Sequence, residues 1–89
     1  KSTIGSHGLG DGKLLEPRYI SINAAGHVLV TDSASDDVEV FTVSGDSNSG
    51  FGIEGTDVGE FDNPRGVASF EGSDYVLDQG NSRILRIVR

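Results

Sequence analysis

The sequence predicts an all-β fold, on the strength of three observations. Short stretches rich in β-branched and aromatic residues alternate with turn sequences. No stretch keeps the 3.6-residue period of an amphipathic helix. One pattern of residues occurs twice along the 89-residue chain, and an internal repeat of this length is typical of repeat architectures.

Three strands are expected in the first half of the chain, at 19–22, 27–30 and 38–41. They are too short for helices and partly alternate between apolar and polar residues. Glycine, serine and aspartate gather between them, as turns require; these turns are Ala25-Gly26, Ser33–Asp37 and Ser44–Asp46.

The repeat relates the two halves of the chain residue by residue. A shift of 47 positions aligns Gly5 with Gly52, Gly8 with Gly55, Gly12 with Gly59, Pro17 with Pro64 and Arg18 with Arg65. After a one-residue deletion the shift becomes 46, and it aligns Gly26 with Gly72, Val30 with Val76 and Asp32 with Asp78. Matching glycines alone would carry little weight in a chain with 13 of them. The shared Pro-Arg pair and the Gly-x-x-x-Val-x-Asp spacing make the repeat specific.

Each copy has one further strand before its three, at 2–6 for the first copy and at 49–53 for the second. Four short antiparallel strands in about 40 to 45 residues match a blade of a β-propeller. The sequence therefore predicts two four-stranded antiparallel blades per chain.

The second copy resembles the NHL-repeat β-propellers. The residues that carry the resemblance are Phe51-Gly52-x-x-Gly55, Gly59-x-Phe61-x-x-Pro64-Arg65-Gly66-Val67-Ala68, Gly72 and Asp78-x-Gly80-Asn81-x-Arg83-Ile84. The first copy is a weaker match, because Ser35 stands where the pattern has Asn, Asp37 where it has Arg, and Tyr19 where it has Gly.

The order of strands implies that blades exchange strands between chains. Residues 1–6 form an outer strand without a blade, 7–53 form blade 1, and 54–89 form blade 2 without its own outer strand. Because the family usually has six blades, three chains are expected to close one ring, as a homotrimer held head to tail. The expected interface is Thr3, Ile4 and Gly5 of one chain against Ile84, Leu85, Ile87 and Val88 of the next. The alternative is a piece excised from a longer propeller, or an engineered one.

Arg18, Tyr19 and Arg65 are the candidate ligand-binding residues. The resemblance implies that both arginines lie near one mouth of the central channel, where they would contact an anion or a carboxylate. The alternative is a structural ion pair with a nearby acid such as Glu16 or Asp62.

Four residues are candidates for a structural role in turns: Asp32, Asp78, Asn81 and Arg83. An aspartate at a turn accepts hydrogen bonds from backbone N–H groups, and Arg83 is placed to pair with a carboxylate. In the first copy, Asp32, Asp36 and Asp37 lie close together instead. This acidic turn lacks the alternation, the glycine and the terminal glutamate of a calcium loop, so no metal site is expected.

Composition argues against several classes of function. Asp and Glu number 14 against 7 Lys and Arg, giving a net charge of -7, which opposes a nucleic-acid partner. There is no cysteine, the two histidines His7 and His27 have no metal-ligand spacing, and no Gly-x-Ser-x-Gly motif occurs. The glycine-rich stretch Gly5–Gly12 lacks the residues of a phosphate loop. No apolar run approaches the roughly 18 residues of a membrane span.

These observations predict a non-catalytic NHL-type binding or scaffold module that needs no cofactor and assembles with copies of itself. Its further partner would be a protein or a small molecule. Single-stranded RNA binding, which some members of the family perform on a basic face, is the alternative function. An enzymatic role, as in family members that are amidating lyases with metal-binding histidines, is not supported, because the two histidines lack metal-ligand spacing. An engineered or excised fragment would have no natural ligand.

Overall fold

The computed structural model describes residues 2–8, 13–46, 50, 53–54 and 60–88. The predicted all-β fold is confirmed, since strands dominate and the described part adds only one short 3-10 turn, η1 (Gln79–Asn81).

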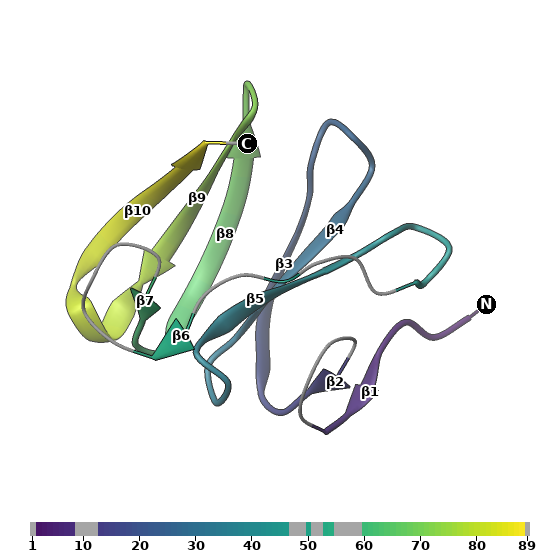
Figure 1. Cartoon of the computed structure of the whole chain (residues 1–89), viewed down its shortest axis with the longest axis horizontal. Coiled ribbons are helices and arrows are strands. Elements are labelled where there is room, and N and C mark those ends of the chain that lie inside the picture. Colours follow the sequence, from purple (N-terminus) through teal and green to yellow (C-terminus); the bar gives the residue numbers. More distant parts are fainter. Residues whose placement is uncertain (1, 9–12, 47–49, 51–52, 55–59, 89) are drawn as a thin grey trace.

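Two three-stranded antiparallel sheets form the body of the molecule (Figure 1). The first sheet has the order β3 (Pro17–Ile22), β4 (Val28–Asp32), β5 (Asp37–Phe41). The second has the order β8 (Pro64–Phe70), β9 (Ser73–Asp78), β10 (Arg83–Val88). Each sheet is a meander of consecutive strands. The strands predicted at 19–22 and 38–41 fall within the first sheet, and the strand predicted at 27–30 does so from Val28 on.

The structure repeats as the sequence does. A short parallel pair precedes each sheet: β1 (Ser6–His7) pairs with β2 (Lys13–Leu14), and β6 (Ile53–Glu54) pairs with β7 (Glu60–Phe61). The two pairs are related by the same shift of 47 residues that relates the two sequences.

The predicted fourth strands do not form in the described residues. Ser2–Gly5 lie outside any strand. Of the predicted strand at 49–53, residues 49, 51 and 52 lie outside the described residues, and Ile53 pairs parallel with β7 rather than antiparallel with β5. Gly50, in no strand, lies against the edge of β5, where an added Cβ would meet the Val38 carbonyl oxygen at 2.8 Å. Glycine and serine dominate 44–52, and their low β propensity accounts for the absence of ladder pairing at Gly50.

The main core lies between the two sheets. Strands β4 and β5 contribute Leu29, Val38 and Val40, and the second sheet contributes Val67 and Val76, with Phe61 closing the cluster. Leu85 and Ile87 of β10 pack against it. Because side chains alternate along a strand, each sheet also has a second face. On the first sheet this second face carries Val28, Val30 and Phe41, with Ile4 and Leu14 packed against them.

The first strands of the two sheets lie side by side (Figure 1). Both begin at the repeated Pro-Arg pair, and in both the register with the neighbouring strand shifts at the arginine, between Pro17 and Tyr19 and between Pro64 and Gly66. Such bulges re-aim side chains at the ends of sheets. Arg18 and Arg65 therefore share both a repeated Pro-Arg sequence and a register shift in the strand.

Candidate functional site

Arg18 is held by its own sheet. Its Nη2 lies 2.9 Å from Glu16 Oε1, and its Nε donates to Ser33 Oγ at 3.1 Å. Ser33 Oγ in turn donates to the same Glu16 oxygen at 2.7 Å. The Ser33 hydrogen bond first and the Arg18 guanidinium second lower the pKa of Glu16. The structural alternative considered for this arginine, an ion pair with Glu16, is the arrangement that the structure shows.

Arg65 has a different environment. It is exposed, and no ion pair joins it to Glu16, Asp62 or any other described residue. It lines a groove of about 350 Å³ together with Tyr19, across which lie Leu77 and Ile84. The charge of Arg65 contributes to the lowered pKa of Glu16, but its guanidinium makes no salt bridge with a described residue. A guanidinium of this kind beside an aromatic ring suits a carboxylate or another anionic group.

Tyr19 connects the two arginines. Its side chain also lines a second groove of about 330 Å³ that contains Arg18. Tyr19 stands where the second repeat has Gly66, is 58% exposed and lines both grooves. Tyr19 therefore shares a groove with each arginine. Of these two arginines, Arg18 forms a salt bridge and Arg65 forms none with a described residue.

The turn after β9 brings together three of the predicted structural residues. The buried Asp78 carboxylate accepts hydrogen bonds from Arg83 Nε at 2.8 Å, from Asn81 Nδ2 at 2.9 Å and from the Asp62 backbone N–H at 2.7 Å. Burial opposes ionisation of Asp78, but the Asp62, Asn81 and Arg83 interactions outweigh it and lower the pKa. Arg83 also donates to the Glu60 carbonyl oxygen at 2.7 Å, so it ties the turn to β7.

Asp32 occupies the equivalent position in the first repeat without an arginine. Its carboxylate instead accepts four backbone N–H groups, from Leu15 at 2.7 Å, Glu16 at 3.0 Å, and Ala34 and Ser35 at 3.1 Å each. Burial raises the pKa of Asp32, and these four donors lower it by more. The carboxylates of Asp32 and Asp78 therefore both have a structural role, because their hydrogen bonds hold neighbouring loop segments in place.

The acidic turn of the first repeat also joins the two halves. Asp36 Oδ1 accepts the backbone N–H of Asn63 at 2.8 Å.

Burial first, and then the hydrogen bond and charge of Glu39, raise the pKa of Asp37 to about 8. Among the described residues, no group of three or more metal-ligating side chains could hold a metal ion.

The predicted interface residues divide between the two sides of β10. Ile84 and Val88 are exposed on its outer side, whereas Leu85 and Ile87 pack against the core. At the other end of the chain, Thr3 is exposed, and Ile4 packs on the cluster formed by Val28, Val30 and Phe41.

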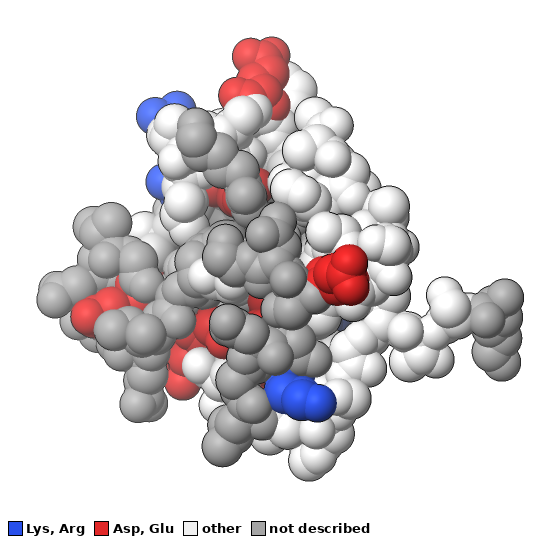
Figure 2. All heavy atoms as spheres, turned by 45° about the vertical axis from the view of Figure 1, so that its right-hand side comes forward, with Lys and Arg blue, Asp and Glu red and all other residues white. Residues whose placement is uncertain are grey.

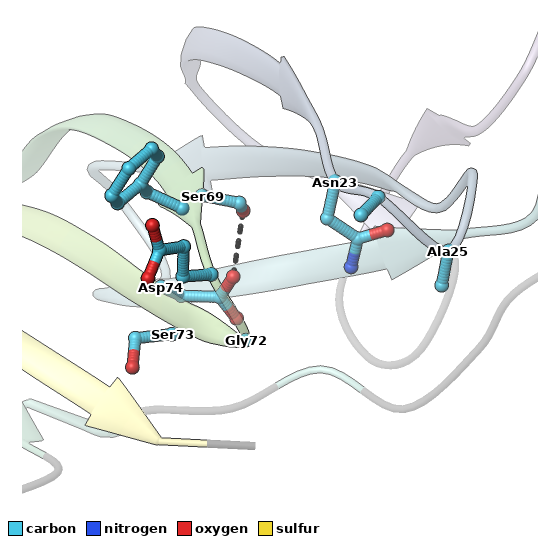
Figure 3. A pocket seen from close by; sticks show the side chains of 9 residues that line it. Asn23, Ala25, Ser69, Gly72, Ser73 and Asp74 are labelled. Carbon is cyan, nitrogen blue, oxygen red and sulfur yellow. Dashed lines mark hydrogen bonds between the residues drawn. The ribbon is translucent and has the colours of Figure 1, made fainter.

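A third cavity, of about 450 Å³, was missed by the sequence analysis (Figure 3). It lies between the β3–β4 hairpin, which contributes Asn23 and Ala25, and the β8–β9 hairpin, which contributes Ser69, Phe70 and Asp74. A signal was present in the repeat: Ser69 and Asp74 stand where the first copy has Ile22 and Val28.

The surface view in Figure 2 shows acidic side chains scattered over the described part of one face, with few and separate basic ones.

No described helix is long and apolar enough to span a membrane. The chain matches no protein-family model and no curated protein.

Proposed function

We propose that the chain is a non-catalytic NHL-type propeller module whose two sheets act as neighbouring blades. Copies of it assemble head to tail, three to a ring, which covers the Leu77 and Ile84 side of the groove. Arg65 and Tyr19, at the beginning of the two first strands, contact a protein or small-molecule ligand. The observation that carries the proposal is a sheet-to-sheet interface inside the chain. One half of it recurs exposed on the second sheet, and the other half recurs on the first sheet with Ile20 exposed.

The internal interface uses opposite faces of the two sheets. The first sheet contributes the face of Leu29, Val38 and Val40, and the second contributes the face of Val67 and Val76. Under the repeat, Val38 corresponds to Ile84, and Val67 corresponds to Ile20. The first sheet therefore carries, at Ile20, a copy of the face that the second sheet packs into the internal interface. The second sheet carries, at Ile84, a copy of the face that the first sheet packs there.

The copy on the second sheet is exposed. In the copy on the first sheet, Ile20 is exposed, whereas Val30, Glu39 and Phe41 are buried and Ile4 and Leu14 pack on Val30 and Phe41. Val38 is 0% exposed, but its counterpart Ile84 is 67% exposed. Val67 is 4% exposed, but its counterpart Ile20 is 63% exposed. Leu77, the counterpart of buried Thr31, is exposed in the same way. Leu77 and Ile84 are cross-strand neighbours, and contiguous exposed apolar surface of this kind marks an interaction site.

Charge supports the same pairing. In the internal interface, Val40 and Leu85 lie at the same core. Their repeat counterparts are Arg86 and Glu39. A second copy docked in the internal geometry would bring the exposed Arg86 toward the strand that holds Glu39, a carboxylate that is 4% exposed and lies beside Asp37; an attraction between opposite charges of this kind favours the correct register of docking.

The contact is heterologous, because the two surfaces that meet are different. A heterologous contact either closes into a ring or continues as a filament, and the six blades usual in the resembled family favour a ring of three chains. Figure 1 shows β1 and β10 on opposite sides of the molecule, so one chain's beginning can reach the next chain's β10 edge. Residues 2–6 would there supply the fourth strand that β10 lacks in the described part.

Light scattering tests the assembly. The expected mass is three times the 9.3 kDa of one chain. Ile84→Lys and Ile20→Lys change exposed side chains on the two docking faces, and each should prevent ring closure. Val43→Lys is the matched control, because Val43 is equally exposed but lies in the turn after β5. A monomeric parent chain, or rings that survive both face variants, would contradict the proposal.

Titration with a labelled single-stranded RNA across a range of salt concentrations separates the alternative function. The proposed module binds it weakly at all salt concentrations, because the net charge of -7 opposes the phosphates. Tight binding with a steep salt dependence would favour the RNA-binding hypothesis instead.

A further inference from the structure

The end of the internal sheet-to-sheet interface at the β3–β4 and β8–β9 hairpins carries polar side chains (Figure 3). On the second sheet, Ser69 and Asp74 are a cross-strand pair, and Ser69 Oγ donates to Asp74 Oδ1 at 2.7 Å. Asp74 lies two residues before the core residue Val76, so this pair is on the face that packs on the first sheet. On the first sheet, Asn23 lies across a cavity of about 450 Å³ from the pair. Inside the chain, polar side chains at one hairpin end therefore face a polar side chain at the other.

The repeat counterparts of these three residues are apolar. In the first sheet, the cross-strand pair of Ile22 with Val28 takes the place of the serine–aspartate pair. In the second sheet, Phe70, which follows Ser69 directly, takes the place of the asparagine, which follows Ile22 directly. Ile22 is 62% exposed and Phe70 is 66% exposed, whereas Val28 is buried. Two large apolar side chains are therefore exposed at equivalent ends of the two sheets.

Both exposed side chains lie on the proposed docking faces. Phe70 pairs with Ser73 across its hairpin, so the alternation along β8 places its ring on the face of Leu77, opposite to the face of the serine–aspartate pair. Ile22 comes two residues after Ile20 in β3 and shares its face. If a second copy docks as the two sheets inside the chain do, Phe70 takes the position of the asparagine and reaches the Ile22 end of the next copy.

We infer that Phe70 of one copy packs on Ile22 of the next, and that this contact fixes the order of the sheets around the ring. The inference rests on the proposed assembly and adds to it a reason why first and second sheets alternate. If a second sheet docked on another second sheet, Phe70 would lie against the Ser69–Asp74 pair, and covering polar groups with an apolar ring costs free energy. If a first sheet docked on another first sheet, Asn23 would lie against Ile22, so that neither side chain would have a partner of its own kind. Alternating sheets match apolar ends with apolar ends and polar ends with polar ends, and penalties on the wrong partner are a source of specificity.

Light scattering of the whole chain over a range of concentrations tests the contact. Phe70→Lys and Ile22→Glu each place a charge against an apolar side chain, and each should raise at least tenfold the concentration at which half of the chains are in rings. The double variant Phe70→Lys/Ile22→Glu brings opposite charges together at every contact between copies, so it should form rings at a lower concentration than either single variant. Val43→Lys and Val43→Glu are the controls, because Val43 is 68% exposed but lies in the turn after β5, and they should leave this concentration unchanged.

Fluorescence gives a second measurement, because the chain has no tryptophan of its own. In Phe70→Trp the emission should move to shorter wavelengths as the chain assembles, and the shift should be smaller in Phe70→Trp/Ile22→Glu at an equal fraction of rings.

The outcomes separate this contact from the assembly itself. Single variants that form rings as readily as the Val43 controls, or a double variant that assembles no better than either single variant, would overturn the contact and leave the assembly standing. Tighter assembly of Phe70→Lys alone would place Phe70 opposite Asp74 and would overturn the order of the sheets. A monomeric parent chain, or rings that survive both Ile84→Lys and Ile20→Lys, would overturn the proposed assembly and this inference with it.

Discussion

Replacing Arg83 with methionine should be among the most damaging single changes at an incompletely buried position. The substitution keeps the aliphatic stem but removes the partner of a carboxylate whose side chain is 0% exposed, at a distance of 2.8 Å. Removing one partner of a buried ion pair costs about 3–5 kcal/mol. Arg83 is itself 26% exposed, and Asp78 keeps the hydrogen bonds from Asn81 and Asp62, so we expect a loss of about 2–3 kcal/mol.

Such a loss is large for this chain. At about 0.05–0.15 kcal/mol per residue, 89 residues have an unfolding free energy of about 4–13 kcal/mol. The melting temperature should fall by roughly 10–20 °C. Urea unfolding at pH 7 measures the change, with Arg65→Met as the control because Arg65 makes no ion pair with a described residue.

A double-mutant cycle assigns the loss to the pair. In an Asp78→Asn background the charge is gone, so Arg83→Met should cost at least about 1 kcal/mol less than it does in the parent chain. If Arg83→Met lowers stability no more than Arg65→Met does, or if its cost is the same in both backgrounds, then the Asp78–Arg83 pair does not hold the turn.

Three further perturbations test other parts of the structure. The pKa of Asp37 is raised to about 8, so the folded chain keeps a proton that the unfolded chain loses near pH 4, and the free energy of unfolding falls as pH rises between these values. In urea unfolding, Asp37→Asn should therefore raise the free energy of unfolding by about 1–2 kcal/mol at pH 9, allowing for solvent screening. Near pH 3 the same variant should leave it unchanged. Gly80→Ala would place a Cβ 2.6 Å from the Asp62 carbonyl oxygen and should lower the unfolding free energy by about 1–3 kcal/mol, whereas Gly66→Ala, whose Cβ meets Leu77 at 3.6 Å, should change it by less than about 1 kcal/mol. Deleting residues 1–5 should lower the mass seen by light scattering if they donate a strand; full mass with a lower melting temperature would show that they only cover their own sheet.

The sequence was sufficient to predict the strands and the repeat, because both depend on local chemistry. The Pro-Arg pair and the repeated aspartates reappear at equivalent backbone positions, including the two register shifts. The fourth strands were not predictable in the same way. Their pairing depends on long-range partners, and their glycine-rich sequence has little preference of its own.

The site was predictable only in outline. Arg18 and Arg65 both follow a proline, but the two residues that hold Arg18, Glu16 and Ser33, have Asn63 and Gln79 as their counterparts in the second repeat. The Glu16 pair was therefore visible in the local sequence, whereas the Ser33 contact depends on the tertiary fold. The hairpin cavity depends on how two turns from different repeats face each other. The substitution of Ser69 and Asp74 for apolar residues was visible in the repeat, but its meaning depended on that geometry.

Mixing two face variants tests the central claim most directly. Ile84→Glu keeps the docking face of Ile20, and Ile20→Glu keeps the docking face of Ile84, so each variant alone should be a monomer. Mixed in equal amounts, they have one intact pair of faces and should form a 1:1 dimer of twice the single-chain mass by light scattering. Two monomers that remain monomers after mixing would contradict the claim that these two faces dock on each other.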